Sequence, residues 1–162
     1  MVPPTGGFGG SVESHSTRGP IDGDKLFDFL CEFERLEPLA RGELDDVAAP
    51  TLLQLRFDDG VGEATHARLD VKWTVQDDYT VHYTDSIDRN LRWDVHPHGF
   101  PNPSDERHFH PPPDASNMLN SVEESCIEVT EVVLVSRAVH KLWRSAYERG
   151  TFDGVNAATN PP

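Results

Sequence analysis

The sequence has few cysteines and lacks long apolar runs. Its two cysteines, Cys31 and Cys126, do not form a C-x-x-C pair and lie in apolar-patterned segments. We therefore expect buried thiols in a reducing cytoplasm, not a disulfide or a zinc-binding cysteine cluster. No apolar run approaches the roughly 18 residues that span a bilayer, and the N-terminus lacks the basic start and apolar stretch of a secretory signal. These absences predict a cytoplasmic protein without a membrane partner.

Positive charge is also scarce. The chain carries 14 basic and 28 acidic residues, which gives a formal net charge of −14. The acidic residues are spread along the whole chain, and arginine is preferred over lysine. Such a coat is typical of a halophilic protein, because in molar salt a Debye length of about 3 Å screens the repulsion between acidic groups. The lysines are Lys25, Lys72 and Lys141.

Both ends of the chain are poor in apolar residues. Residues 1–20 are mostly Gly, Pro, Ser and Thr, and residues 151–162 end in a polar, proline-terminated run. Neither segment can bury enough apolar surface to offset the entropy of ordering it. The sequence therefore predicts disordered tails at 1–20 and 151–162 and a single folded domain at 21–150.

Two segments have apolar residues at helical spacing. The first predicts a helix over about 24–37, and the second predicts a helix that ends at Gly150. Thr130 is the predicted cap of the second helix. Because residues 126–135 are rich in β-branched side chains, a strand that runs on to a cap at Ser136 stays an alternative.

Between these helices, apolar and polar residues alternate with period two, which is typical of strands joined by tight turns. A further short strand is predicted after the last of them, and residues 39–50 are expected to form a helical turn and a connector. The predicted strands are 53–57, 67–75, 79–84, 91–96 and 126–129.

The predicted fold class is α+β. An antiparallel meander of four to five strands carries the N-terminal and the C-terminal helix on its apolar face, because that face needs a cover. The other face of the sheet is then open and polar. Its predicted side chains are Arg56, His66, Arg68, Asp70, Lys72, His82, Arg92, Asp94 and His96.

Residues 97–117 contain six prolines, which predicts a long, stiff loop of the kind that is often functional. Two H-x-H pairs accompany it: His96 with His98 at its start, and His108 with His110 within it. In extended backbone, residues i and i+2 project to the same side, so each pair can present two imidazoles together. Paired imidazoles can act as general acid and base or bind a transition metal.

Two chemical interpretations follow from these pairs. A metal site would use three or four of the histidines, together with Asp94 or Asp114. Metal-free cleavage of a phosphodiester would use one histidine to take the proton of a ribose 2′-hydroxyl and another to protonate the leaving oxygen. The phosphate charge would be neutralised by Arg68, Arg92 or Arg107.

A third interpretation is purely structural. The histidines would hydrogen-bond to loop carbonyls or pack on Trp93, Phe100 and Phe109, and so pin the loop. His82 is predicted to face the same way as Arg92, which makes it a candidate for substrate binding if the site is chemical.

Three runs together resemble the TumE-type toxins of prokaryotic toxin–antitoxin pairs: residues 79–85 (Y-T-V-H-Y-T-D), 91–98 (L-R-W-D-V-H-P-H) and 108–110 (H-F-H). The resemblance covers about residues 65–115. It implies antiparallel strands, a cognate antitoxin as partner and RNA as a target. The residues it carries over as catalytic are Arg92, Asp94, His96, His98, His108 and His110. The loop is longer and richer in proline than in the family, and the resemblance does not account for the two helices.

The leading hypothesis is a toxin-like protein that acts as a metal-independent ribonuclease through histidine and arginine chemistry. One alternative is a non-enzymatic interaction module of a halophile, which would bind a partner or form a homo-oligomer through the open sheet face or the last helix. Another is a His-rich protein that binds a divalent transition metal at the H-x-H pairs. Whether the protein is an enzyme stays open. The polar face of the last helix carries the basic residues Arg137, His140, Lys141 and Arg144.

Overall fold

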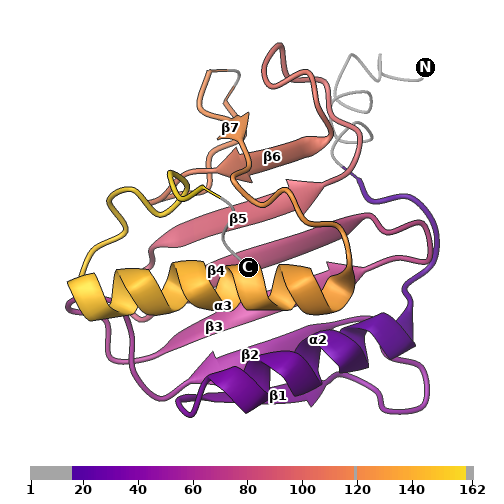
Figure 1. Cartoon of the computed structure of the whole chain (residues 1–162), viewed down its shortest axis with the longest axis horizontal. Coiled ribbons are helices and arrows are strands. Elements are labelled where there is room, and N and C mark those ends of the chain that lie inside the picture. The colour runs from indigo at the N-terminus through magenta and orange to yellow at the C-terminus, as the bar shows by residue number, and fades with distance from the viewer. Residues whose placement is uncertain (1–15, 119, 160–162) are drawn as a thin grey trace, which may run out of the picture.

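The computed structural model describes residues 16–118 and 120–159, so most of the predicted N-terminal tail lies outside the described residues. Within them, two helices cover one face of a seven-stranded antiparallel sheet whose strands follow one another in chain order (Figure 1). The predicted α+β meander is confirmed, but four to five strands was too few. The elements are α2 (Gly23–Leu36), β1 (Ala40–Leu44), β2 (Leu53–Phe57), β3 (Ala67–Trp73), β4 (Tyr79–Asp85), β5 (Asn90–Val95), β6 (Arg107–His110), β7 (Glu123–Glu124) and α3 (Val132–Arg149).

Strand β1 replaces the helical turn predicted at 39–50. It pairs with β2, with Arg41 opposite Arg56, and forms the edge of the sheet beside α2. Gly42 allows the close approach of helix and strand, because a Cβ at this position would lie 1.9 Å from Leu30 Cδ1. The strand was missed because its short, mostly polar sequence shows little apolar alternation.

Strand β6 lies inside the stretch predicted as one loop from 97 to 117, and this prediction is therefore wrong for residues 107–110. The prolines exclude ladder hydrogen bonds only at their own positions, and residues 104–110 contain no proline. Strand β6 pairs with β5, and β7 pairs with β6 in turn. The strand predicted at 126–129 is not formed, since the pairing ends at Glu124.

The two helices begin and end at recognisable signals. The Asp22 side chain accepts a hydrogen bond from the Lys25 N–H at the start of α2. The N-cap position of α3 is Glu131 rather than Thr130, without a side-chain hydrogen bond to the helix, and the early start of the helix also excludes a strand up to Ser136. The end at Gly150 is confirmed, because this residue adopts the left-handed conformation with a φ of 74°.

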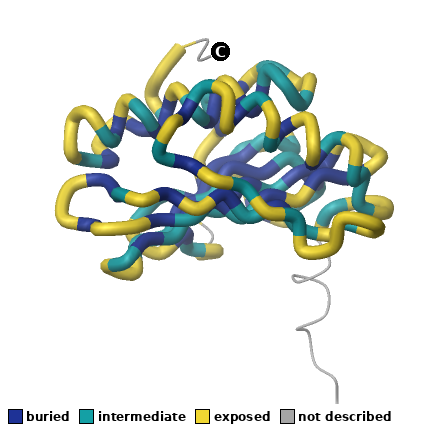
Figure 2. Tube along the Cα trace, turned by 90° about the horizontal axis from the view of Figure 1, so that it is seen from below, coloured by how far each residue is buried: buried dark blue, intermediate teal, exposed yellow. Residues whose placement is uncertain are grey.

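The apolar core lies between the sheet and the helices. Buried segments occupy the interior of the chain trace, and exposed segments lie at the outer turns (Figure 2). Phe57 of β2 stacks on Trp143 of α3 at a ring separation of 4.2 Å, and Leu69 and Trp73 of β3 are fully buried. Each such side chain stabilises the fold by about 1.5–3 kcal/mol through burial.

Two further expectations need correction. Residues after 150 still contribute to the core, because Phe152 and Val155 are buried and Phe152 packs edge-on against Tyr83 at 5.0 Å. Cys31 is exposed and Cys126 is only half-buried, although neither cysteine forms a disulfide. Neither of the described helices has the length and apolarity that a bilayer crossing requires.

Candidate functional site

The open face of the sheet arranges its polar side chains in rows across strands β3 to β6. Residues directly opposite one another on paired strands have Cβ atoms about 4.5–5.5 Å apart, so the register alone makes these side chains neighbours. One row is Asp70, His82, Arg92 and His110. The next row is Lys72, Thr80, Asp94 and His108.

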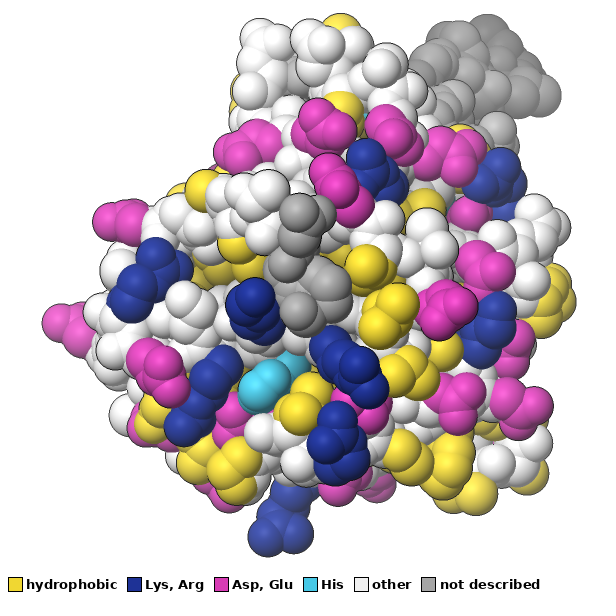
Figure 3. All heavy atoms as spheres, viewed as in Figure 1, with side chains coloured by type: hydrophobic (Ala, Val, Ile, Leu, Met, Phe, Trp, Pro, Cys, Tyr) yellow, Lys and Arg dark blue, Asp and Glu magenta, His cyan; other side chains and the backbone are white. Residues whose placement is uncertain are grey.

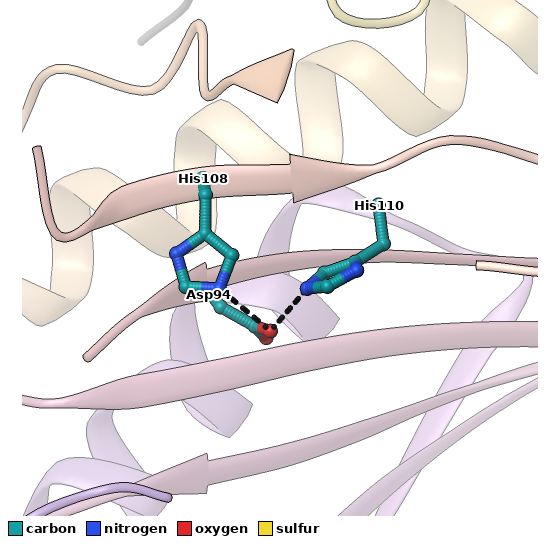
Figure 4. Close-up of side chains that lie close together, drawn as sticks. All are labelled: Asp94, His108 and His110. Atoms are coloured by element: carbon teal, nitrogen blue, oxygen red, sulfur yellow. Dashed lines mark ion pairs between the residues drawn. The ribbon is translucent and has the colours of Figure 1, made fainter. Parts of the chain in front are cut away.

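Asp94 lies at the centre of the site and is fully buried. His108 and His110 project from β6 towards the Asp94 side chain on β5 (Figure 4). One carboxylate oxygen, Asp94 Oδ2, is therefore surrounded by nitrogen atoms. Its distances are 2.7 Å to Arg92 Nε, 3.2 Å to His110 Nε2, 3.4 Å to His96 Nε2 and 3.5 Å to His108 Nε2.

The second nitrogen of each of these imidazoles faces a backbone carbonyl. Because a carbonyl only accepts hydrogen bonds, Nδ1 carries the proton and donates in all three rings. In the neutral form, each Nε2 then presents a lone pair towards Asp94. The Nδ1–oxygen distances are 2.8 Å from His96 to Pro97, 2.8 Å from His108 to Glu106 and 2.9 Å from His110 to Ser116. These are loop-carbonyl contacts of the kind that the structural interpretation expects.

The electrostatics of the cluster are dominated by burial and by Asp94. Burial by itself raises the pKa of the Asp94 carboxyl, but hydrogen bonds that the three imidazoles donate from Nε2–H when they are protonated, and the charge of the Arg92 guanidinium, outweigh it and hold this pKa well below its usual range. Burial also acts on the imidazoles of His96 and His108, where it favours a lower pKa. For His108 burial dominates and the pKa is lowered, whereas for His96 the Asp94 carboxylate outweighs burial and the pKa is raised. Among the described residues, Asp94 Oδ1 and the Nε2 atoms of His96 and His108 are buried without a hydrogen-bond partner.

A pocket of about 670 Å³ opens above this cluster. The Arg92 guanidinium reaches from Asp94 to its rim, where Nη2 donates to Asn117 Oδ1 at 3.3 Å. His82 also borders the pocket, and burial lowers its pKa. Lys72 and Asn117 line the pocket but were not among the predicted site residues. The strand alternation placed Lys72 on this face, whereas no pattern indicates Asn117, because its position depends on the path of the loop.

Three of the predicted site residues do not reach Asp94. The His98 ring packs against that of His108 at 4.6 Å, but its Nε2 contacts the Asp105 carbonyl at 2.6 Å, because the extended backbone that would align it with His96 ends at Val95. Arg107 projects to the opposite face, where it donates to the Ile127 carbonyl at 3.2 Å. Arg68 is on the open face but pairs with a neighbouring aspartate and does not line the pocket.

The basic residues of α3 are largely paired within the molecule. On the helix-covered face, lysine and arginine side chains lie among acidic ones (Figure 3). Arg137 pairs with Glu32 at 2.8 Å. His140 and Arg144 contact the buried Glu37 at 3.2 and 3.3 Å. These contacts tie α3 to α2 and account for Arg137, His140 and Arg144 without a nucleic acid.

The comparison with known proteins agrees with the resemblance found in the sequence. A family model described as Toxin TumE matches residues 31–149, which is most of the chain and more than the expected 65–115. The match includes all of α3, which the resemblance in the sequence had left unexplained. No curated protein and no solved structure matches the chain. The chain therefore belongs to the TumE toxin family.

Proposed function

We propose that this protein is the toxic component of a toxin–antitoxin pair and that it cleaves RNA in the pocket above Asp94. Membership of the toxin family implies a cognate antitoxin as partner. One observation carries the proposal of RNA cleavage: Arg92 links the buried cluster around Asp94 to a pocket that is also bordered by imidazole and ammonium groups.

The pocket has the charges that a phosphodiester requires. Arg92 is held in place by Asp94 and Asn117, and Lys72 lies on the same face of the sheet. A guanidinium fixed by a carboxylate is well suited to bind phosphate oxygens. Because the chain as a whole is strongly acidic, the attraction of RNA must be local, and the phosphate contacts weaken further in high salt.

Two imidazoles border the pocket and suit acid–base cleavage of RNA. His82 Nε2 lies 2.9 Å from Asn90 Oδ1, so Nδ1 is the nitrogen that can accept the proton of the 2′-hydroxyl. The 2′-oxygen then bonds to phosphorus, and the bond from phosphorus to the next 5′-oxygen breaks. His96, the second imidazole at the pocket, donates a proton to that oxygen. The products are a 2′,3′-cyclic phosphate and a 5′-hydroxyl.

The remaining histidines of the cluster have a positioning role in this proposal. His108 and His110 are fully buried and, unlike His96, do not line the pocket, so in this proposal they contact Asp94 and not the substrate. His110 Nε2 lies 3.0 Å from Arg92 Nη2 and so helps to orient the guanidinium. Independence of a metal stays a prediction that the chemistry of the products can test.

The test is cleavage of a structured RNA by the purified protein in molar KCl, with and without EDTA. Wild type is compared with Arg92→Lys, which keeps the charge but loses the forked guanidinium. Arg56→Lys is the matched control, because Arg56 is an exposed arginine of the same face outside the pocket. We expect Arg92→Lys to cleave at least about 10-fold more slowly, as removal of a positioned group does, and the control to cleave like wild type.

The ends of the products separate the possible mechanisms. A 2′,3′-cyclic phosphate formed in the presence of EDTA supports metal-free attack by the 2′-hydroxyl. A 3′-hydroxyl and a 5′-phosphate, lost with EDTA, support attack by water with a metal ion. If wild type cleaves no RNA but binds its antitoxin, the proposal of a ribonuclease is wrong and the interaction module is the better hypothesis.

A further inference from the structure

We propose that Asp94, His108 and His110 form a binding site for a divalent transition-metal ion, with zinc as the best fit. Ion binding concerns the floor of the same pocket but does not depend on RNA cleavage. The ligands would be one carboxylate oxygen and the two Nε2 atoms of the imidazoles on β6, which Figure 4 shows converging on Asp94.

The distances between the ligand atoms suit such an ion. A tetrahedral zinc with bonds of about 2.0–2.1 Å has ligand atoms about 3.3 Å apart. Asp94 Oδ2 lies 3.2 Å from His110 Nε2 and 3.5 Å from His108 Nε2. The three ligand atoms all lie within 4.8 Å of one another. Three protein ligands leave one coordination position open, as is usual in catalytic zinc sites.

The surroundings of the two imidazoles also favour a metal ligand. Metal-bound histidines commonly donate their other nitrogen to a carbonyl or carboxylate, which fixes the tautomer and the ring. His108 and His110 do so, to the carbonyls of Glu106 and Ser116. Both rings therefore already hold the tautomer in which Nε2 can bind a cation.

Unpartnered polar atoms at the same point give an independent argument. Among the described residues, His108 Nε2 and Asp94 Oδ1 are buried without a hydrogen-bond partner. A buried polar atom without a partner costs about 1–3 kcal/mol. An ion bound to Asp94 Oδ2 and His108 Nε2 would give the His108 nitrogen the partner that it lacks in this arrangement.

Arg92 would compete with the ion. Its Nε donates to Asp94 Oδ2 at 2.7 Å, and its Nη2 lies 3.0 Å from His110 Nε2. The side chain is 22% exposed and its Nη2 also contacts Asn117 at the rim of the pocket. Arg92 can therefore turn into the pocket when an ion takes its place, which leaves the guanidinium free for a phosphate.

The test uses the full chain, purified without a polyhistidine tag and freed of metal with a chelator. Co²⁺ is added as a spectroscopic probe, because tetrahedral Co²⁺ has an intense visible absorption, and Zn²⁺ is then added to displace it. We expect one equivalent of Co²⁺ to bind and Zn²⁺ to remove the absorption. Asp94→Asn and His108→Gln should each lower the affinity for Co²⁺ at least about 100-fold, since each removes a ligand.

His66→Gln is the matched control, because His66 is an exposed histidine outside the cluster, and its affinity should equal that of wild type. Circular dichroism of the metal-free proteins verifies that each variant folds, and His110→Gln replaces any variant that does not. The proposal is overturned if wild type binds no Co²⁺ at about 100 μM, or if folded ligand variants bind it like wild type. Because binding is read from the absorption, a failure to cleave RNA does not affect this result.

Discussion

The two faces of the sheet are built on different principles. The face under α2 and α3 buries apolar side chains such as Leu69 and Trp73, and the hydrophobic effect explains their place. The open face instead buries a carboxylate and imidazoles, with Asp94 and His108 fully buried. Burying charged groups costs free energy that their mutual attraction often does not repay. The burial on the helix-covered face therefore serves stability. The burial of charged groups on the open face needs another explanation, which we assign to the chemistry of the pocket.

The largest expected effect compares two positions of β3 that point to opposite faces. Leu69→Ala should lower the free energy of unfolding by about 2–5 kcal/mol, because it opens a cavity in the core. Lys72→Ala, at an exposed position of the same strand, should change it by less than about 0.5 kcal/mol. Urea denaturation in molar KCl measures both values. Equal losses would break the distinction between the two faces.

Salt should change the stability of the whole molecule through its acidic surface. The net charge of −14 predicts strong repulsion at low ionic strength, which molar KCl screens. We expect the free energy of unfolding to rise by about 1–3 kcal/mol between 0.1 and 2 M KCl as this repulsion is removed. Sucrose is the control for general exclusion of cosolutes. A stability that is flat or falls with KCl would contradict a halophilic protein.

Replacing Arg92 tests the competition on the open face. Arg92→Met removes the guanidinium that contacts Asp94 Oδ2 and His110 Nε2. The affinity for Co²⁺ should therefore rise about 10-fold, which corresponds to about 1.4 kcal/mol. The same absorption titration measures this change. An unchanged or weaker affinity would show that Arg92 does not compete with the ion.

The smallest effect concerns an ion pair between the two helices. Hydrogen bonds from Arg35 and Arg137 lower the pKa of Glu32 to about 2. Because the folded pKa is depressed, the stabilisation is present above the unfolded pKa of about 4.3 and is lost as the pH falls through about 2. Glu32→Gln should cost about 0.5–1 kcal/mol at pH 7 after allowance for screening, and only a small fraction of that at pH 2. Thermal unfolding at both pH values measures the difference.

The sequence predicted the fold best where the alternation is long. The seven residues of β3 alternate without interruption, and the end of α3 was marked by Gly150. Strand β6 was missed because its four residues lie among prolines, although the H-x-H spacing of His108 and His110 was already that of a strand. The same spacing places Arg107 on the opposite face, so its assignment to the site could have been avoided.

Other features of the site could not be derived from local patterns. The sequence placed Asp94 on the open face, but its burial results from the pairing of β6, which is a tertiary contact. The contact of His98 with the Asp105 carbonyl instead of Asp94 depends on where β5 ends, and the contact of Asn117 with Arg92 depends on the path of the loop. These are long-range consequences of packing, and no residue spacing indicates them.

Measuring RNA cleavage and stability together for His82→Gln tests most directly whether the open face serves chemistry and not stability. His82 pairs across the strands with Asp70 and borders the pocket. Its side chain and that of the nearby Leu69 point to opposite faces of the sheet. We expect cleavage to fall at least about 100-fold, as for loss of a general base, while the free energy of unfolding changes by less than about 1 kcal/mol. Cleavage at the rate of wild type would contradict this expectation, as would a loss of stability like that of Leu69→Ala.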